Sequence, residues 1–303
     1  MNIDALNAKF EIPGTLRLTT GRGGLPMIEI ENGLASALIS LQAGQVLSYR
    51  PASAAQDLLF LSERAYFEPG KAIKGGVPIC WPWFGADPEG KGRPTHGFVR
   101  SMPWTLLATQ TLEGGATQVT IGMADDQDTR AQWPQHFNLA LEVTVGATLG
   151  VELITRNPQD RPFTITQALH TYFNVGDATR SRVLGLEGCR YIDKAANAKD
   201  AVITQEGPVT FSAEVNRIYQ RVPPVLLIED PALGRRVRIE SRNSATCIVW
   251  NPWIETARSM GDLDDADYQI MLCVETANAA DEVIEVPAGG EVLLAADYRI
   301  EPL

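Results

Sequence analysis

The chain is poor in histidine and cysteine and has no excess of positive charge, and these shortages exclude several classes of function. Its 303 residues hold 26 Lys and Arg against 37 Asp and Glu, which gives a formal net charge of −11. Proteins that bind nucleic acids or anionic membrane surfaces draw affinity from clustered Lys and Arg, and no run of this sequence is strongly basic. We therefore expect neither nucleic acid nor a membrane as a partner.

The three histidines and four cysteines do not form a metal-binding motif. His96, His136 and His170 stand far apart, and no C-x-x-C or H-x-x-x-H pair is present. A three-histidine site would require the fold to bring these residues together, so we expect no metal. Buried free thiols are the expected state of the cysteines, Cys80, Cys189, Cys247 and Cys273.

Long apolar runs are also missing. No uncharged apolar stretch reaches the ~18 residues that a membrane span needs. The first six residues, MNIDAL, lack the basic and apolar regions of a secretory signal. We expect a cytoplasmic protein that is a monomer.

Helical periodicity is scarce, whereas short β-branched and apolar runs are common between the 26 Gly and 19 Pro residues. Helices are expected only at residues 126–132 and 254–260, so a doubly wound α/β fold is excluded. No internal repeat or linker is visible, and the sequence predicts one all-β, mainly antiparallel sandwich over residues 1–303. The expected strands are residues 34–41, 104–109, 118–123, 139–147, 151–156, 163–173, 225–228, 236–240, 246–250, 268–276 and 292–299.

Two glycine-rich segments and one acidic segment are expected to be loops. Residues 85–91 match G-x-x-x-x-G-K, but Gly92 follows where a phosphate-binding loop needs Ser or Thr, and Arg93-Pro94 follows instead of a helix. Residues 21–24, GRGG, neither follow a clear strand nor open a helix. The run Asp262 to Asp267 supplies carboxylates that a glycosidase could use, but charge runs are usually solvated loops.

One histidine and one glutamate occupy informative positions in the predicted strands. In residues 163–173, His170 alternates with the apolar positions and falls on the same face as Tyr172. In residues 268–276, Glu275 lies opposite the apolar face, near the strand end. A partly buried carboxyl there would have a raised pKa, as a general base requires, whereas a Glu in water at a strand end is at least as common.

The segment from Lys74 to Arg100 is rich in glycine, proline and aromatic residues. Trp81 and Trp83 suit either the edge of a sugar pocket or a core aromatic cluster, and the sequence leaves both open. His96 and Arg100 are four residues apart on an expected loop entering a strand. They would fall on one side and could converge on an anion.

These segments resemble the hexose-6-phosphate mutarotases, the glucose-6-phosphate 1-epimerase branch of the aldose 1-epimerases. The likeness covers nearly the whole chain, and the matching segments occur in the same order as in the family. Its parts are residues 45–49 (QVLSY), 74–78 (KGGVP), 81–85 (WPWFG), 96–100 (HGFVR), 168–173 (ALHTYF), 249–253 (VWNPW) and 273–275 (CVE).

The resemblance implies a galactose mutarotase-like β-supersandwich without a cofactor that exchanges the anomers of a hexose 6-phosphate, glucose 6-phosphate above all. Glu275 is then similar to the base that takes the proton of the anomeric hydroxyl. His170 is similar to the acid that protonates the ring oxygen. His96 would form a hydrogen bond near the ring, and Lys74 and Arg100 would hold the phosphate. Because the net charge of −11 opposes attraction of an anionic sugar, we also expect a local basic patch at the cleft mouth, formed by Lys74 and Arg100 with Arg93 as a further candidate.

The chain departs from the family pattern at three of its expected substrate contacts. Thr95 stands where Gln is common, Asn216 where Asp is common, and Lys74 where Arg is common. Trp250, in the VWNPW segment, completes the expected substrate-binding set. These departures bear on sugar preference and phosphate affinity more than on the reaction type.

Two other functions stay open beside the mutarotase reading. An aldose 1-epimerase for unphosphorylated sugars would leave Lys74 and Arg100 as structural cations. A sugar-binding β-sandwich without turnover would need no acid or base at all.

Overall fold

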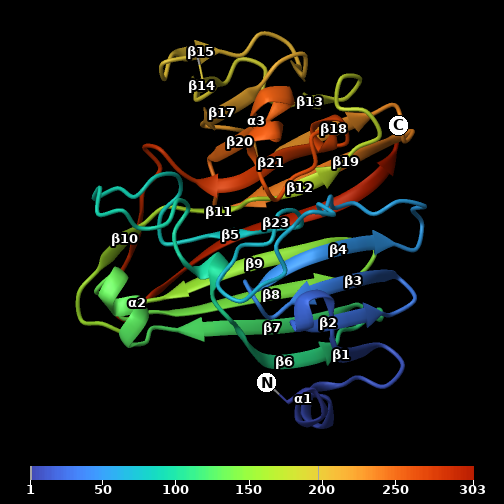
Figure 1. Ribbon diagram of the computed structural model, residues 1–303, viewed down its shortest axis with the longest axis vertical. Helices are drawn as coiled ribbons and strands as arrows, with labels where there is room; N and C mark the ends of the chain where they lie inside the picture. The colour runs from blue at the N-terminus through green and yellow to red at the C-terminus, as the bar shows by residue number, and fades with distance from the viewer. Residues whose placement is uncertain (1, 197) are drawn as a thin grey trace.

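The computed structural model describes residues 2–196 and 198–303, and antiparallel β-strands are its main regular secondary structure (Figure 1). The described residues form three short α-helices, α1 (Ile3–Phe10), α2 (Gln127–Gln132) and α3 (Trp253–Ser259). The predicted all-β class is confirmed, as are both expected helices to within a residue or two. Helix α1 was not predicted; the Asn2 side chain caps it by accepting a hydrogen bond from the Ala5 amide.

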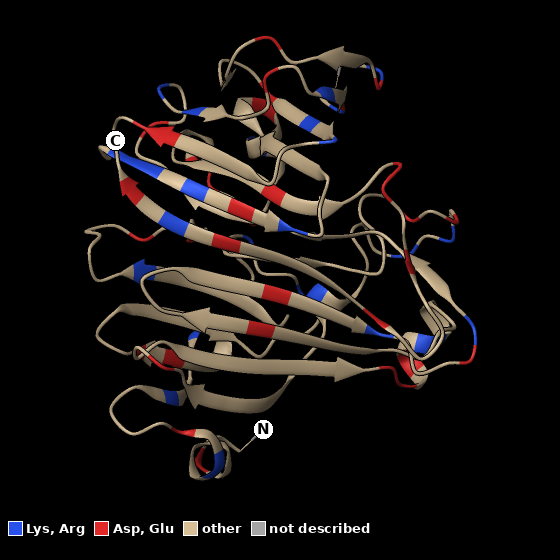
Figure 2. Ribbon diagram, turned by 180° about the vertical axis from the view of Figure 1, so that it is seen from behind, with Lys and Arg blue, Asp and Glu red and all other residues tan. Residues whose placement is uncertain are grey.

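A nine-stranded antiparallel sheet forms the back layer of the molecule in Figure 1. In spatial order its strands are β16 (Val209–Thr210), β13 (Arg182–Leu184), β18 (Val225–Asp230), β19 (Arg235–Arg242), β23 (Glu291–Pro302), β9 (Leu149–Arg156), β8 (Asn138–Val145), β7 (Thr117–Ala124) and β6 (Thr105–Thr111). Charged residues of both signs occur along its strands, as Figure 2 shows.

An eight-stranded sheet lies in front of one half of the back layer. Its strands run in the order β15 (Val202–Thr204), β14 (Arg190–Asp193), β17 (Val215–Gln220), β20 (Thr246–Asn251), β21 (Met271–Asn278), β11 (Gln167–Leu169) and β5 (Ile79–Cys80), and β12 (Tyr172–Asn174) also pairs with β21. A four-stranded sheet covers the other half (Figure 1). It comprises β1 (Leu16–Thr20), β2 (Pro26–Glu31), β3 (Ala35–Ser40) and β4 (Gln45–Pro51), and β10 (Phe163–Ile165) pairs separately with β22 (Ile284–Val286).

The main core lies between these layers and fixes which side chains of β21 face outward. Leu272 and Val274 pack into the same core cluster as Tyr298 of the back sheet. Because side chains alternate along a strand, Cys273 and Glu275 project from the opposite face of β21. The outer face of the eight-stranded sheet therefore carries the polar groups of this strand.

The predicted strand over residues 163–173 is wrong in its continuity. The segment forms three short strands, β10, β11 and β12, and His170 and Thr171 lie between the last two. The His170 amide donates to the Pro78 carbonyl, and the Thr171 hydroxyl lies 2.7 Å from the Tyr298 hydroxyl. Since these partners lie outside the local sheet ladder, residue-by-residue alternation could not reveal the break.

The strand predicted over residues 268–276 begins later than expected. Tyr268 belongs to a 3₁₀ turn at Asp267–Gln269, and β21 starts at Met271. The strand also continues to Asn278, two residues past its predicted end, so Glu275 lies in the interior of the strand rather than near its end. This shift favours the buried carboxyl over the solvated one.

The two tryptophans of the WPWFG segment belong to the core. Trp81 is fully buried, with ring centroids 5.1 Å from Trp133 and 4.5 Å from Phe137, and Trp83 lies 5.8 Å from Phe98. Of the two interpretations left open by the sequence, the core aromatic cluster is therefore the correct one. The next aromatic residue, Phe84, is half-buried and lines the cavity described in the next section.

We expect Gly97→Ala to destabilise the fold strongly, because Gly97 has φ +72° and an added Cβ would lie 1.8 Å from the Trp81 carbonyl oxygen. Gly92→Ala is the matched control, with φ +78° and no atom within 4 Å of the new Cβ. Both variants carry the conformational cost of positive φ, about 1–3 kcal/mol. Urea unfolding should show an additional loss of about 2 kcal/mol or more for Gly97→Ala alone. Equal losses in the two variants would contradict the close approach.

Candidate active site

A cavity of about 710 Å³ opens on the outer face of the eight-stranded sheet. Its volume lies in the range of small-molecule sites, about 300–1,000 Å³. Most of the substrate-binding and catalytic residues predicted from the sequence line this cavity. Several residues that the sequence did not predict also line it. The lining includes Lys74, Phe84, His96, Arg100, His170, Tyr172, Lys194, Asn216, Trp250, Met260 and Glu275.

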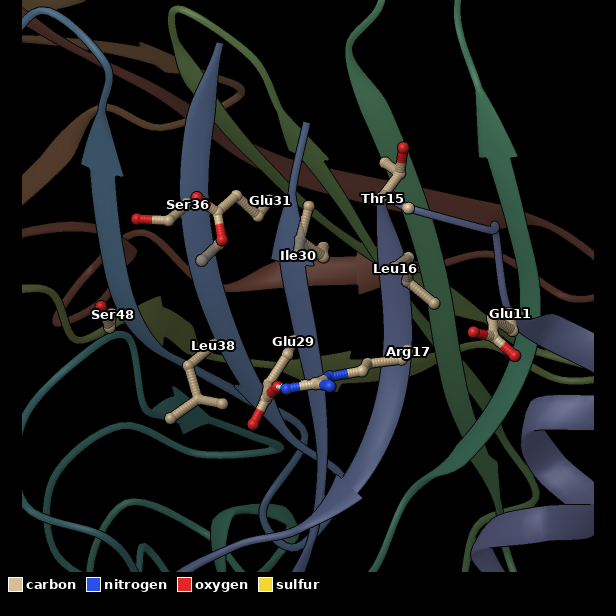
Figure 3. A pocket seen from close by; sticks show the side chains of 12 residues that line it. Glu11, Thr15, Leu16, Arg17, Glu29, Ile30, Glu31, Ser36, Leu38 and Ser48 are labelled. Atoms are coloured by element: carbon tan, nitrogen blue, oxygen red, sulfur yellow. Dashed lines mark hydrogen bonds and ion pairs between the residues drawn. The ribbon is translucent and has the colours of Figure 1, made fainter. Parts of the chain in front are cut away.

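A second hollow, of about 520 Å³, lies over the four-stranded sheet and is less suited to an anionic ligand (Figure 3). Its one lining cation, Arg17, forms an ion pair with Glu29 at 2.8 Å. Glu11 and Glu31 add further negative charge to its walls. No histidine or cysteine is among its lining residues, so the cavity over the eight-stranded sheet is the candidate active site.

His170 and Glu275 meet at the floor of the candidate site. His170 follows β11, Glu275 projects from β21, and the His170 Nε2 lies 3.4 Å from the Glu275 Oε1. The glutamate is 1% exposed and the histidine 8%. The imidazole stacks on the Tyr172 ring at 4.9 Å and an interplanar angle of 12°, which fixes its orientation. An acid and a base are thus held within reach of one small ligand.

Burial favours the neutral form of both groups. It raises the pKa of Glu275 well above the usual carboxyl range, and the nearby Arg100 opposes this rise. It also lowers the pKa of His170 well below the ordinary imidazole value, and His96, Arg100 and Lys74 lower it further. Because the two groups are in contact, they titrate as a pair. Shifts in these opposite directions let the two groups share one proton, as an acid and base partnership requires.

His96 lies beside this pair as a neutral hydrogen-bonding group. Burial lowers its pKa to about 3, and the positive charges of Arg100 and Lys74 contribute. The Gly85 amide donates to its Nδ1 at 3.2 Å, so the neutral ring carries its proton on Nε2. Its ring centroid is 5.6 Å from that of His170. His96 is therefore built to donate to a ligand oxygen.

Three cations line the same cavity, and two of them, Lys74 and Arg100, were predicted from the sequence. Lys74 forms an ion pair with Asp262 at 3.5 Å and lies 3.9 Å from the Met260 sulfur. Arg100 occupies a 3₁₀ turn, Val99–Ser101, and its guanidinium donates to the Thr95 carbonyl at 2.9 Å. The expected strand that would align His96 and Arg100 is wrong, because a left-handed residue at His96, φ 65°, turns the chain there. The turn nevertheless brings both side chains to the cavity.

Two expected contacts lie elsewhere. Thr95 is exposed and does not line the cavity; it contributes only the carbonyl that holds Arg100. Arg93 forms ion pairs with Asp87 and Glu89 and stacks over Trp83 at 4.3 Å. With its charge already paired, Arg93 is not part of the basic lining. The prediction that it contributes at the cleft mouth is wrong.

Asn216 and Trp250 line the cavity as predicted, and the structure adds residues that the sequence did not single out. Asn216 and Trp250 are cross-strand partners between β17 and β20, so they share one face. Tyr172 could have been found, since it alternates with His170 on the polar face of its segment. Lys194 gives no such signal; it follows β14, its amide donates to the Asn216 carbonyl, and its ammonium pairs with the exposed Asp200.

The loops excluded as ligand sites behave mostly as predicted. The Asp87 carboxylate accepts hydrogen bonds from the amides of Glu89, Lys91 and Arg93, which closes a compact turn in place of a phosphate loop. His136 pairs with Asp125 at 2.9 Å outside the candidate site, so the three histidines do not converge. The prediction that the acidic segment is a solvated loop is wrong in one respect, because Asp262 forms an ion pair with Lys74.

The cysteines agree with prediction except at one position. All four are free thiols; Cys80, Cys247 and Cys273 are buried, whereas Cys189 is half-buried. None of the helices within residues 2–196 and 198–303 combines the length and apolar character needed to cross a bilayer.

Comparison with known proteins agrees with this geometry. The family model described as Aldose 1-epimerase matches residues 26–295. The chain belongs to the aldose 1-epimerase family. A member of the family from Escherichia coli K12, named "Putative glucose-6-phosphate 1-epimerase", is 37% identical over 257 residues, which cover 85% of this chain and 84% of the relative. A plant relative with the same name, from Cenchrus ciliaris, is 35% identical over 265 residues, 84% of this chain and 78% of the relative.

The fold of the family is shown by solved structures. A Salmonella typhimurium crystal structure, described as "a putative mutarotase", superposes with a TM-score of 0.89 at 32% identity and covers 99% of both chains. The expected galactose mutarotase-like architecture is thus confirmed. Family membership also implies a sugar as substrate.

We expect Glu275→Gln to stabilise the protein at neutral and alkaline pH. The folded-state pKa of Glu275 is raised, so the native state retains a proton that the unfolded state releases, and stability falls as pH rises above the unfolded value of about 4.5. The uncharged amide removes that cost. Thermal unfolding across pH should show a stability gain for Glu275→Gln that grows above this value and vanishes at lower pH. A control at exposed Glu113, Glu113→Gln, should show no such trend; a stability loss for Glu275→Gln at alkaline pH would contradict the buried carboxyl.

Proposed function

We propose that this protein interconverts the α and β anomers of a hexose 6-phosphate, with glucose 6-phosphate as the expected substrate. One observation carries the proposal: a buried imidazole and carboxyl, 3.4 Å apart, lie at the floor of a cavity that Lys74 and Arg100 also line. The names of the Escherichia coli and Cenchrus ciliaris relatives support the choice of sugar.

In the proposed reaction one proton enters the ring oxygen as another leaves the anomeric hydroxyl. Glu275 takes the O1 proton while His170 donates its proton to O5, so that the C1–O5 bond breaks and an open-chain aldehyde forms. Rotation about C1–C2 presents the other face of the carbonyl. O5 then attacks C1, returns its proton to His170, and O1 recovers a proton from Glu275. No atom or electron is gained or lost, and both residues end as they began.

The phosphate has a second role beside anchoring. Lys74 and Arg100 both lower the pKa of His170, which disfavours the protonated imidazole that the reaction needs. A bound phosphate dianion between these cations offsets their field and raises the pKa of His170. The phosphorylated substrate therefore prepares its own acid. An unphosphorylated sugar would leave the imidazole in its depressed state.

The remaining lining residues suit the rest of the sugar. The His96 Nε2–H donates near the ring, Asn216 contacts a hydroxyl, and Trp250 and Tyr172 offer apolar faces to the CH groups of the ring. Thr95 acts only through its carbonyl, which holds the Arg100 guanidinium. Asp262 pairs with Lys74, and we expect the substrate phosphate to compete with this carboxylate for the ammonium.

The phosphate assignment is tested by comparing anomerisation rates of glucose 6-phosphate and glucose. Because each charge-assisted contact contributes about 1.5–3 kcal/mol, Lys74→Met and Arg100→Leu should each lower kcat/KM for the phosphorylated sugar by about 10–100-fold. Neither change should affect the much slower reaction of glucose to that extent. The matched controls Lys91→Met and Arg258→Leu alter exposed cations outside the cavity and should change neither rate.

Two rival functions give different results in the same assay. Equal efficiency on both sugars would establish an aldose 1-epimerase without phosphate preference. A non-catalytic sugar-binding protein would show no rate above the spontaneous one. In the enzyme, His170→Ala and Glu275→Gln should each lower kcat by about 10²–10⁴-fold while glucose 6-phosphate still binds, as calorimetry would show.

A further inference from the structure

A third ionisable side chain lies beside the proposed acid and base and has no part in the proposed reaction. Cys273 and Glu275 are alternate residues of β21, so their side chains project from the same face. Cys273 lies opposite Tyr172 of β12 and opposite Trp250 of β20, and both of these aromatic residues line the cavity. The buried thiol therefore packs beneath these two lining residues, next to the cavity rather than in its wall.

The three side chains form a compact set of metal-ligating atoms. One ligand atom each from His170, Cys273 and Glu275 lies within 4.8 Å of the other two, and all three residues are buried. The set is the only such group of three or more within the described residues. In a tetrahedral zinc site, bond lengths of about 2.0–2.3 Å place neighbouring ligand atoms about 3.3–3.8 Å apart. A movement of about 1 Å, within the reach of side-chain rotation, would therefore complete the arrangement.

Unpartnered polar atoms supply a second, independent observation. The Glu275 Oε2 and the His170 Nδ1 are buried and make no hydrogen bond to any described residue. The contact between His170 Nε2 and Glu275 Oε1, at 3.4 Å, is also longer than a good hydrogen bond. Buried polar atoms of this kind are unusual in folded proteins and are satisfied readily by a ligand. A cation at this point would pair the carboxylate and accept the imidazole lone pair.

We propose that His170, Cys273 and Glu275 form an inhibitory binding site for a thiophilic divalent cation such as Zn²⁺ or Cd²⁺. One nitrogen, one sulfur and one oxygen ligand leave a fourth position open toward the cavity, the pattern of an accessible rather than a closed zinc site. The thiolate selects Zn²⁺ and Cd²⁺ over Mg²⁺ and Ca²⁺, which prefer oxygen ligands. On binding, the Cys273 S–H bond breaks and the proton retained by the His170–Glu275 pair is also lost; metal–sulfur, metal–oxygen and metal–nitrogen bonds form, both protons pass to solvent, and no electron is transferred.

The inhibitory effect, which rests on the proposed function, follows from the ligands that the metal uses. Coordination occupies the imidazole lone pair and a carboxylate oxygen, so neither residue can exchange protons with a sugar. Metal and sugar phosphate then compete for one cavity. Binding itself is independent of catalysis and can be measured without any activity assay.

The direct test is titration of the purified, metal-free protein with zinc chloride in competition with a chromophoric chelator. Wild-type protein should bind one Zn²⁺ per chain, and Cys273→Ser should weaken that binding by at least about tenfold, because even partners of metal ligands contribute about 10–100-fold. Cys247→Ser is the matched control: it is also a buried free thiol, but it lies outside the three-residue set. Cd²⁺ should give the ultraviolet thiolate-to-metal absorption in wild type and in Cys247→Ser, but not in Cys273→Ser.

Separate controls test whether the Cys273 variants are folded and whether metal binding depends on the proposed function. Thermal unfolding of Cys273→Ser without metal verifies that it is folded, and Cys273→Ala replaces it if it is not. If the proposed function is wrong but the site is real, Zn²⁺ still binds and the cadmium absorption still depends on Cys273. Zinc binding that is unchanged in both Cys273 variants, equal affinity for Mg²⁺, or the absence of stoichiometric zinc binding in wild type would overturn the proposal.

Discussion

The candidate site depends on one physical constraint, which is the burial of a carboxyl in the interior of a strand. Glu275 has apolar neighbours such as Ile248 on β20 and Val274 on β21, and no Lys or Arg among the described residues forms an ion pair with it, so its charged form is costly. The sheet tolerates it because the adjacent His170 can share the proton. A shared proton suits the pair to the proposed proton transfer, and its burial lowers the free energy of unfolding, as is common at functional sites.

The recognition of a sugar phosphate that we propose would be local. The chain carries a net charge of −11, which disfavours long-range attraction of a sugar phosphate. Along the strands of the back sheet, charges of both signs occur and pair, as with Arg242 and Glu152 (Figure 2). Within the cavity, by contrast, Lys74 and Arg100 lie close enough to lower the pKa of His170. Their proximity links the binding of phosphate to the acidity of the reacting group.

The long strands and the outward faces of His170 and Glu275 could be predicted, because alternation is a local property of the sequence. Strands of two to four residues, such as β13 to β16, are too short to show a period, and pairing with distant segments forms them. The same limit applies to the site. The sequence predicts Cys273 only as a buried thiol. Lys194 lines the cavity and Asp262 pairs with Lys74 through tertiary contacts that residue spacing in the sequence does not encode.

We expect burial, Lys74 and Arg100 to keep the pKa of His170 low until a phosphorylated sugar binds. Nitrogen-15 NMR titration of His170 measures this directly, first in the free protein and then with 1,5-anhydroglucitol 6-phosphate, which has no anomeric hydroxyl to react. The account predicts a pKa well below the ordinary value of about 6.5 in the free protein and a rise on binding. An ordinary pKa in the free protein, or one that the sugar phosphate leaves unchanged, would contradict it.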